Sequence, residues 1–244
     1  MIGCTCATCL SSDPRDQRLR PSIHIDAGGR GAILVDTSPD LRQQALRHHI
    51  ARIDAVVFTH SHADHILGFD ELRRFNVLKS GPMPCYGDAS TWQTLRRTFY
   101  YVFDGEERQG GGIPQVEIHE IEGPIAVAGV TMVPVPLLHG RRQILGFRSG
   151  GFAYLTDASA IPEASWPLID GVDTLIINAL RHRPHPTHFS LSEALEAILR
   201  IRPRRAYLTH MCHDIAHEET SRQLPAGVEL AYDGLTLDVD VAGV

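Results

Sequence analysis

Four side chains that commonly bind metal ions occur within a stretch of six residues. They are His60, His62, Asp64 and His65. The i, i+2 spacing of the first two histidines lets both imidazole rings point to the same side of an extended backbone, and the last two residues begin the turn that follows. A single metal ion cannot use all four ligands comfortably. Two adjacent ions can, if distant loops complete their coordination.

Three further metal-binding side chains follow apolar segments that have the pattern of buried strands. They are His139, Asp157 and His210. A lone histidine at such a position is more often a partly buried structural residue, and a lone aspartate more often caps a helix. Because three of them occur at strand ends in one chain that also has the 60–65 cluster, we expect them to complete the same site.

Hydrolysis is the chemistry expected of such a site. Two adjacent metal ions would lower the pKa of a shared water from about 15.7 towards about 7, and Asp64 can orient the resulting hydroxide. The leaving group then needs a proton, which we expect from His188, just before a capped helix. The alternative is that His188 only joins an exposed polar loop with His182 and His185. Arg141 and Arg142 can hold an anion by bidentate hydrogen bonds, or are simply solvated.

Three cysteines near the N-terminus indicate a second kind of metal site. They are Cys4, Cys6 and Cys9. A closed tetrahedral zinc site needs a fourth ligand. We expect His213, because it follows His210 by three residues and the two would not easily face one metal pair. Cys212 and Cys85 are rival fourth ligands, and the alternative to a structural zinc is a set of unpaired buried thiols.

Short aliphatic runs alternate with amphipathic stretches, which indicates a mixed α/β fold. Strands are predicted at 22–26, 32–36, 55–59, 116–121, 130–137, 152–156, 174–178, 206–209 and 228–231. Helices are predicted after the N-cap Ser38 with Pro39 at the first helical position, and after the capping box that starts at Ser190 and ends before Pro203. A further helix should follow His65, with its apolar face on Phe69, Leu72 and Phe75, and another should span 89–100.

The chain length of 244 residues predicts one domain over 1–244. The net charge of −6, with Lys79 as the single lysine, argues against a nucleic-acid partner but permits a small anionic substrate. The most apolar stretch, 125–138, is interrupted by two prolines and is too short for a membrane span. Five cysteines and no signal sequence favour the cytoplasm. The glycine-rich segment 104–114 is either a mobile loop over the site or an exposed connection.

The spacing His-x-His-x-Asp-His, followed by a strand-end histidine, aspartate and histidine, resembles the metallo-β-lactamase superfamily. The resemblance implies an αββα sandwich. It assigns one metal ion to His60, His62 and His139, the other to Asp64, His65 and His210, and makes Asp157 the bridging carboxylate. Electron-transferring members have an acidic residue where this chain has His62, so hydrolysis is favoured. Five histidines and two aspartates favour Zn²⁺ over Mn²⁺.

The cysteine cluster, the segment Asp13-Pro14-Arg15, the pattern Arg18-x-Arg20-x-Ser22 and the segment 36–42 resemble one branch of that superfamily. The branch contains the phosphoribosyl 1,2-cyclic phosphate phosphodiesterase of phosphonate breakdown and, more distantly, pyrroloquinoline quinone synthesis protein B. The resemblance implies a structural zinc bound by three cysteines and a late histidine, which the trio and His213 match. It also implies an additional catalytic histidine upstream of the last metal ligand, which His188 matches.

The resemblance therefore predicts a phosphodiesterase acting on a small phosphate ester, cyclic or open-chain, with two Zn²⁺ or Mn²⁺ ions in the active site and one structural Zn²⁺. The alternatives are a lactone or thioester hydrolase and a non-hydrolytic accessory protein of cofactor biosynthesis. Relatives begin with a strand before the cysteines, whereas Met1 stands three residues before Cys4. We therefore expect the first strand of the fold to be missing and an exposed sheet edge that permits a homodimer.

Overall fold

The computed structural model describes residues 1–104 and 112–244. These residues form two compact units. The histidine-cluster unit comprises Arg20–Met132 with Gly243–Val244, and the cysteine-cluster unit comprises Met1–Leu19 with Val133–Ala242. One domain over 1–244 stays a prediction. Most of the glycine-rich segment 104–114, expected to be either a mobile loop or an exposed connection, lies outside the described residues.

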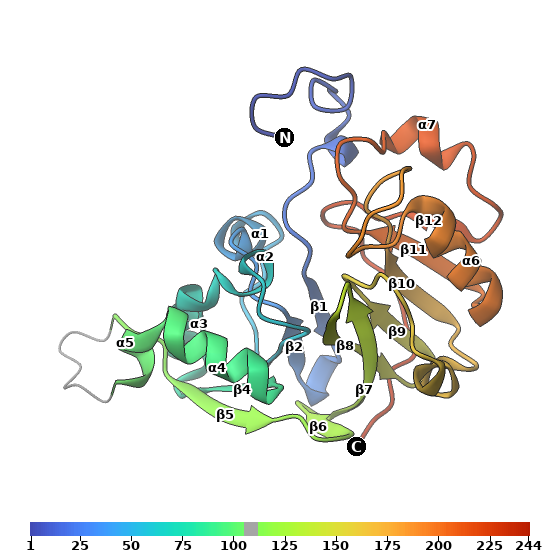
Figure 1. The fold of residues 1–244 in the computed structure, drawn as a ribbon. Coiled ribbons are helices and arrows are strands. Elements are labelled where there is room, and N and C mark those ends of the chain that lie inside the picture. Colours follow the sequence, from blue (N-terminus) through green and yellow to red (C-terminus); the bar gives the residue numbers. More distant parts are fainter. Residues whose placement is uncertain (105–111) are drawn as a thin grey trace. The chain divides into compact units, whose positions relative to one another are not determined.

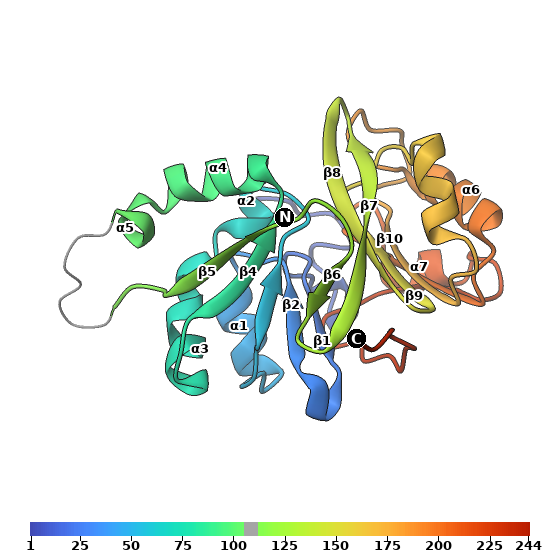
Figure 2. The same cartoon turned by 90° about the horizontal axis from the view of Figure 1, so that it is seen from below.

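The histidine-cluster unit contains a five-stranded sheet of order β1-β2-β3-β4-β5 (Figure 2). The strands are β1 (Ile23–Asp26), β2 (Ala32–Val35), β3 (Ala55–Val57), β4 (Met83–Gly87) and β5 (Val116–Glu120). β1 is antiparallel to β2, and the remaining neighbours are parallel. Every residue of β2 and β3 is buried, as expected for parallel strands in the middle of a sheet.

Helices pack against this sheet and form its apolar core. They are α1 (Leu41–Arg47), α2 (Ala63–Ile66), α3 (Leu72–Lys79), α4 (Ala89–Thr98) and α5 (Tyr100–Phe103), with 3₁₀ turns η2 (Gly28–Arg30) and η3 (Phe69–Glu71). The helix predicted after the histidine cluster is divided, because Phe69 lies in η3 and Leu72 and Phe75 lie in α3, but the predicted apolar face is confirmed, since all three side chains are buried.

The predicted start of α1 is wrong. The helix begins at Leu41 with Asp40 at the N-cap position, so Pro39 lies outside it. The Ser38 hydroxyl instead accepts a hydrogen bond from the Asp40 amide and donates one to Gln44 Oε1. Ser38 therefore closes a turn immediately before the helix, which is a common alternative use of a serine side chain.

The cysteine-cluster unit contains parallel strands that continue into an antiparallel hairpin, in the order β12-β11-β10-β9-β8-β7 (Figure 1). The strands are β7 (Val130–His139), β8 (Arg142–Ser149), β9 (Phe152–Leu155), β10 (Thr174–Asn178), β11 (Arg205–Thr209) and β12 (Val228–Leu230). The first residues of β7 belong to the histidine-cluster unit, where they pair with β6 (Ile125–Val127). The hairpin strands β7, β8 and β9 are antiparallel, and β9 to β12 are parallel.

The main helix of this unit is α6 (Leu191–Ile201), which buries four apolar side chains against the sheet. The predicted capping box is confirmed. The Ser190 hydroxyl accepts from the Glu193 amide, and the Glu193 carboxylate accepts from the Ser190 amide. The helix stops before Pro203, with Arg202 in the left-handed region. The unit also contains η1 (Pro14–Asp16), η4 (Glu163–Ile169) and α7 (His217–Ser221). Among the described residues, no helix is long and apolar enough to cross a membrane.

Candidate metal-binding and catalytic residues

The predicted four-residue cluster begins in the loop that connects β3 to α2, with His60 and His62, and continues into α2 with Asp64 and His65. The rings of His60 and His65 are buried, with centroids 4.2 Å apart, and the ring of His62 lies 4.7 Å from that of His60. Asp64 is in the first turn of α2, with a side chain that is 27% exposed. The strand end therefore brings three imidazoles together and leaves one carboxylate accessible beside them.

Asp36 is a functional candidate that the sequence analysis did not single out. Its carboxylate is fully buried and accepts hydrogen bonds from the Thr59 amide (2.8 Å), the Thr59 hydroxyl (2.7 Å) and His65 Nδ1 (2.7 Å). Because a carboxylate can only accept here, the His65 proton resides on Nδ1 and the Nε2 lone pair is left to bind a metal. The signal that could have found Asp36 is an acidic residue directly after the buried run 32–35.

The backbone of Asp36 is strained. Its φ angle is 65°, in the left-handed region that residues with a Cβ rarely adopt. Such a conformation costs on the order of 1–3 kcal/mol and persists only where surrounding contacts impose it. The three hydrogen bonds to the Asp36 carboxylate impose this conformation. The strain therefore indicates that the position of this side chain beside His65 is important for the site.

The second group of predicted residues lies at one edge of the cysteine-cluster sheet. His139 ends β7, Asp157 lies two residues after β9, and His210 directly follows β11. His210 Nε2 is 3.3 Å from Asp157 Oδ1. His139 Nδ1 donates to the Asp157 backbone carbonyl at 2.6 Å, which leaves the other ring nitrogen of His139 to bind a metal. The structure therefore gathers all three predicted strand-end residues of this unit.

His188 lies against the same group. Its ring centroid is 4.6 Å from that of His139 and 4.9 Å from that of His210. His182, by contrast, is exposed. Burial lowers the pKa of His188 to about 3, and the negative charge of Asp157 opposes that shift only in part. At neutral pH the ring is therefore uncharged, so its one N–H group can donate a hydrogen bond to a leaving-group oxygen, but it carries no additional proton to transfer.

The predicted cysteine site is assembled within one unit. Cys4, Cys6, Cys9 and His213 each offer one ligand atom, and these atoms all lie within 4.8 Å of one another. His213 Nδ1 is 3.3 Å from Cys4 Sγ and 3.4 Å from Cys6 Sγ. A tetrahedral zinc ion with the usual bond lengths would separate such atoms by about 3.6 Å, so the residues fit this ion.

The electrostatics of the cysteine site support the same reading. The imidazole of His213 is the main cause that lowers the pKa of the Cys6 thiol to about 6, so a thiolate forms readily. The rival ligands are not part of the group. Cys85 is buried in β4, where burial raises the pKa of its thiol, and the Cys212 sulfur accepts a hydrogen bond from the Asp214 amide.

The two candidate anion-binding arginines lie at the turn between β7 and β8. Gly140 has a φ angle of 63° and permits this tight turn. Arg141 is exposed, and Arg142 is half-buried and pairs in register with His139. Both arginines are thus near the end of β7 that carries His139, and their binding role stays a prediction.

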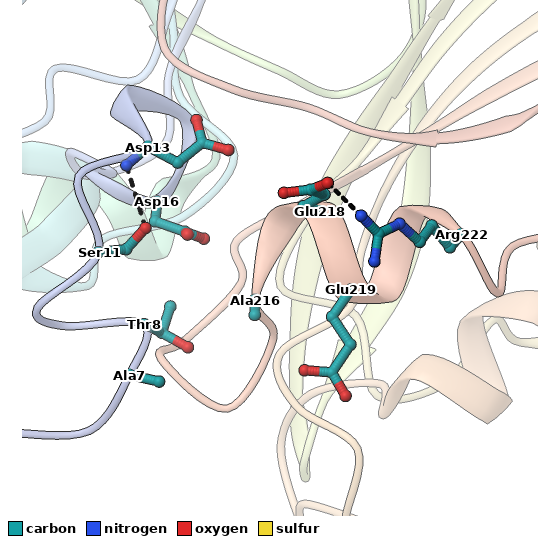
Figure 3. A pocket seen from close by; sticks show the side chains of 9 residues that line it. All are labelled: Ala7, Thr8, Ser11, Asp13, Asp16, Ala216, Glu218, Glu219 and Arg222. Atoms are coloured by element: carbon teal, nitrogen blue, oxygen red, sulfur yellow. Dashed lines mark hydrogen bonds and ion pairs between the residues drawn. The ribbon is translucent and has the colours of Figure 1, made fainter.

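A separate surface hollow of about 240 Å³ lies beside the N-terminal segment and α7 (Figure 3). It is lined by Ala7, Thr8, Ser11, Asp13, Asp16, Ala216, Glu218, Glu219 and Arg222. Arg15 donates to Asp13, Arg18 donates to Asp16, and Arg222 pairs with Glu218. The hollow contains none of the predicted ligands, and most of its carboxylates already have cationic partners.

Comparison with known proteins identifies a family. The family model of the beta-lactamase superfamily domain matches residues 32–211. An octanoyltransferase from Porphyromonas gingivalis is 36% identical over 249 residues, which cover 100% of this chain and 49% of that protein. The chain therefore spans about half the length of this curated relative.

Solved structures show the same relationship. The crystal structure of a diphosphatase from the PhnP family is 44% identical, with a TM-score of 0.92, and the match covers 100% of this chain and 93% of that one. The structure of Zn²⁺-bound PqqB from Methylobacterium extorquens is 19% identical, with a TM-score of 0.74 and coverage of 98% and 95%. The second likeness concerns the fold alone.

Proposed function

The chain belongs to the beta-lactamase superfamily and has the metallo-β-lactamase fold, and from this premise we propose that it is a metal-dependent phosphodiesterase acting on small phosphate esters. The observation that carries the proposal is the grouping of His139, Asp157, His210 and His188 in a chain that is 44% identical to a diphosphatase over its whole length. His139, Asp157 and His210 have side chains that bind metal ions, and His188 can donate a hydrogen bond to the leaving group.

We assign the metal ligands from their order along the chain and from the family. One ion would be held by His60, His62 and His139, and the other by Asp64, His65 and His210, with Asp157 as the bridging ligand. Two ions, when bound, would lower the pKa of bound water and stabilise negative charge on a phosphate. The proposal is supported by Asp36 and by the Asp157 carbonyl, which fix the proton on Nδ1 of His65 and His139.

The remaining residues have distinct proposed roles. Asp64 would accept a hydrogen bond from the attacking water, and His188 would donate its N–H to the leaving-group oxygen. Arg141 and Arg142 would bind phosphate oxygens. Cys4, Cys6, Cys9 and His213 would hold a separate structural zinc ion, which the distances between their ligand atoms accommodate. The homodimer, the absence of a nucleic-acid partner and the cytoplasmic location stay predictions.

The proposal is tested by assaying the Zn²⁺- and Mn²⁺-loaded protein with bis(p-nitrophenyl) phosphate and with a panel of lactones and thioesters. We expect turnover of the phosphate diester that is abolished in Asp64→Ala and only slightly reduced in His188→Ala, because p-nitrophenolate is a good leaving group. The matched control is His182→Ala, an exposed histidine of the same loop, which should retain full activity. Turnover of lactones or thioesters alone would replace the proposal by its alternative, and no turnover at all would favour an accessory protein.

A further inference from the structure

Asn178 is a buried polar residue that neither the sequence analysis nor the proposed function uses. It ends β10, between β9 and β11, and is fully buried. Its side chain makes two hydrogen bonds to the backbone of Ala158. Asn178 Oδ1 accepts from the Ala158 amide at 2.7 Å, and Asn178 Nδ2 donates to the Ala158 carbonyl at 3.0 Å. The side-chain amide thus satisfies both backbone groups of Ala158, which lies beyond the end of β9, where no described strand pairs with these groups.

The residue held in this way is next to Asp157, the proposed bridging ligand. Asp157 has a φ angle of 62°, again in the left-handed region. A strained residue keeps its conformation only when its neighbours are fixed. On its N-terminal side, the Thr156 hydroxyl donates to Asp157 Oδ1 at 2.9 Å. On its C-terminal side, the two hydrogen bonds from Asn178 fix the following peptide groups.

The same carbonyl also anchors the loop that carries His188. The Phe189 amide donates to the Ala158 carbonyl at 2.7 Å, and the Phe189 carbonyl accepts from the Leu180 amide at 2.9 Å. Leu180 is only two residues after Asn178. Hydrogen bonds therefore connect Asn178 to Ala158 and Ala158 to Phe189. Asp157 directly precedes Ala158 in the chain, and His188 directly precedes Phe189.

We propose that Asn178 is a positioning residue that places both Asp157 and His188 through Ala158. The inference rests on the proposed function for what those two residues do, but the contacts themselves do not depend on it. Removal of Asn178 should make the Ala158 and Phe189 amides less well protected from exchange with solvent. It should also weaken metal binding at the site that contains Asp157, and lower kcat more than it raises KM.

The test compares Asn178→Ala with a matched control, Asn76→Ala. Asn76 is also buried and also clamps backbone, because it donates to the Gly81 and Gln115 carbonyls and accepts from the Gln115 amide. Both variants should lose stability. Only Asn178→Ala should lose affinity for the active-site metal ions, by about 10- to 100-fold in a competition titration with a chelator, as is usual when a residue that orients a ligand is removed.

Two readouts are independent of turnover and separate this inference from the proposed function. In the metal-free protein, the Ala158 and Phe189 amides should exchange with solvent faster in Asn178→Ala than in Asn76→Ala. Metal affinity is measured without any substrate. If the wild type hydrolyses no phosphate ester, the proposed function fails, while these two measurements still decide the role of Asn178.

Asn178→Asp covers the case in which the alanine variant does not fold. It keeps the acceptor for the Ala158 amide but loses the donor to the Ala158 carbonyl. Its metal affinity should therefore lie between those of the wild type and the alanine variant, at least threefold below the wild type. The control Asn76→Asp should have the metal affinity of the wild type. Unchanged metal affinity and unchanged Ala158 exchange in the Asn178 variants would overturn the proposal. So would equal losses of metal affinity in the Asn178 and Asn76 variants.

Discussion

Replacing Asp36 by asparagine should weaken metal binding without removing any metal ligand. The Asp36 carboxylate accepts from two groups of Thr59 and from His65 Nδ1. An asparagine has the same shape but only one oxygen for these three donors. Its NH₂ group would face His65 Nδ1, which must then become an acceptor, so that the ring proton moves to Nε2. That nitrogen is the one that would otherwise bind the metal ion.

The size of the effect follows from the hydrogen bond that is lost. A hydrogen bond to a charged group contributes about 1.5–3 kcal/mol. At 1.36 kcal/mol per factor of ten, metal affinity should fall roughly 10- to 160-fold. The assay is a zinc competition titration with a chelator, on a protein whose fold is checked by circular dichroism.

A suitable control for this variant is Asp54→Asn. Asp54 also accepts a backbone hydrogen bond, from the Ala32 amide at 2.9 Å, but it pairs with Arg52 and touches no histidine of the cluster. It should bind zinc as the wild type does. A folded Asp36→Asn protein with wild-type zinc affinity would refute the reasoning that Asp36 fixes the His65 proton.

Three further predictions concern other parts of the molecule. His188→Asn should slow an ester with a poor leaving group by about 10- to 160-fold, which is the worth of a hydrogen bond to a charged oxygen, and a p-nitrophenyl ester much less, since p-nitrophenolate leaves without such help; equal losses would rule out a role of His188 at the leaving group. His213→Ala should lower the metal content by one zinc ion per chain, and loss of all bound metal would contradict a separate structural site. Hydrogen bonds from Arg15 lower the pKa of Asp13 to about 2 from 3.8, so this carboxylate stabilises the fold above pH 4, and its contribution disappears as the pH falls through about 2. The difference in melting temperature between the metal-free wild type and Asp13→Asn should therefore shrink between these pH values, and a constant difference would contradict the assignment.

Most strands were predictable from the sequence because they are aliphatic and buried, as in β3 and β10. The strands that were not predicted break that pattern. β4 contains Pro84 and ends at Gly87, β8 begins with Arg142 and Gln143, and only one of the three residues of β6 is buried. Each is stabilised by neighbouring strands rather than by its own composition, and a local pattern does not record such neighbours.

The candidate ligands were predictable from the sequence because histidines and aspartates at strand ends are a local pattern. The residues that orient them were not. Asp36 lies 29 positions from His65, and Asn178 lies 20 positions from Ala158, and in both cases the contact exists only in the folded chain. The expected N-cap at Ser38 failed for a different, local reason, since its hydroxyl is hydrogen-bonded to Asp40 and Gln44 in a turn.

The central claim is that this chain holds a two-metal site together with a separate structural zinc. Its most direct test is the metal content per chain of protein reconstituted with zinc and freed of excess ions, determined by elemental analysis. We expect three zinc ions per chain in the wild type and two in His213→Ala. A content of one ion or none in the wild type would contradict the two-metal site.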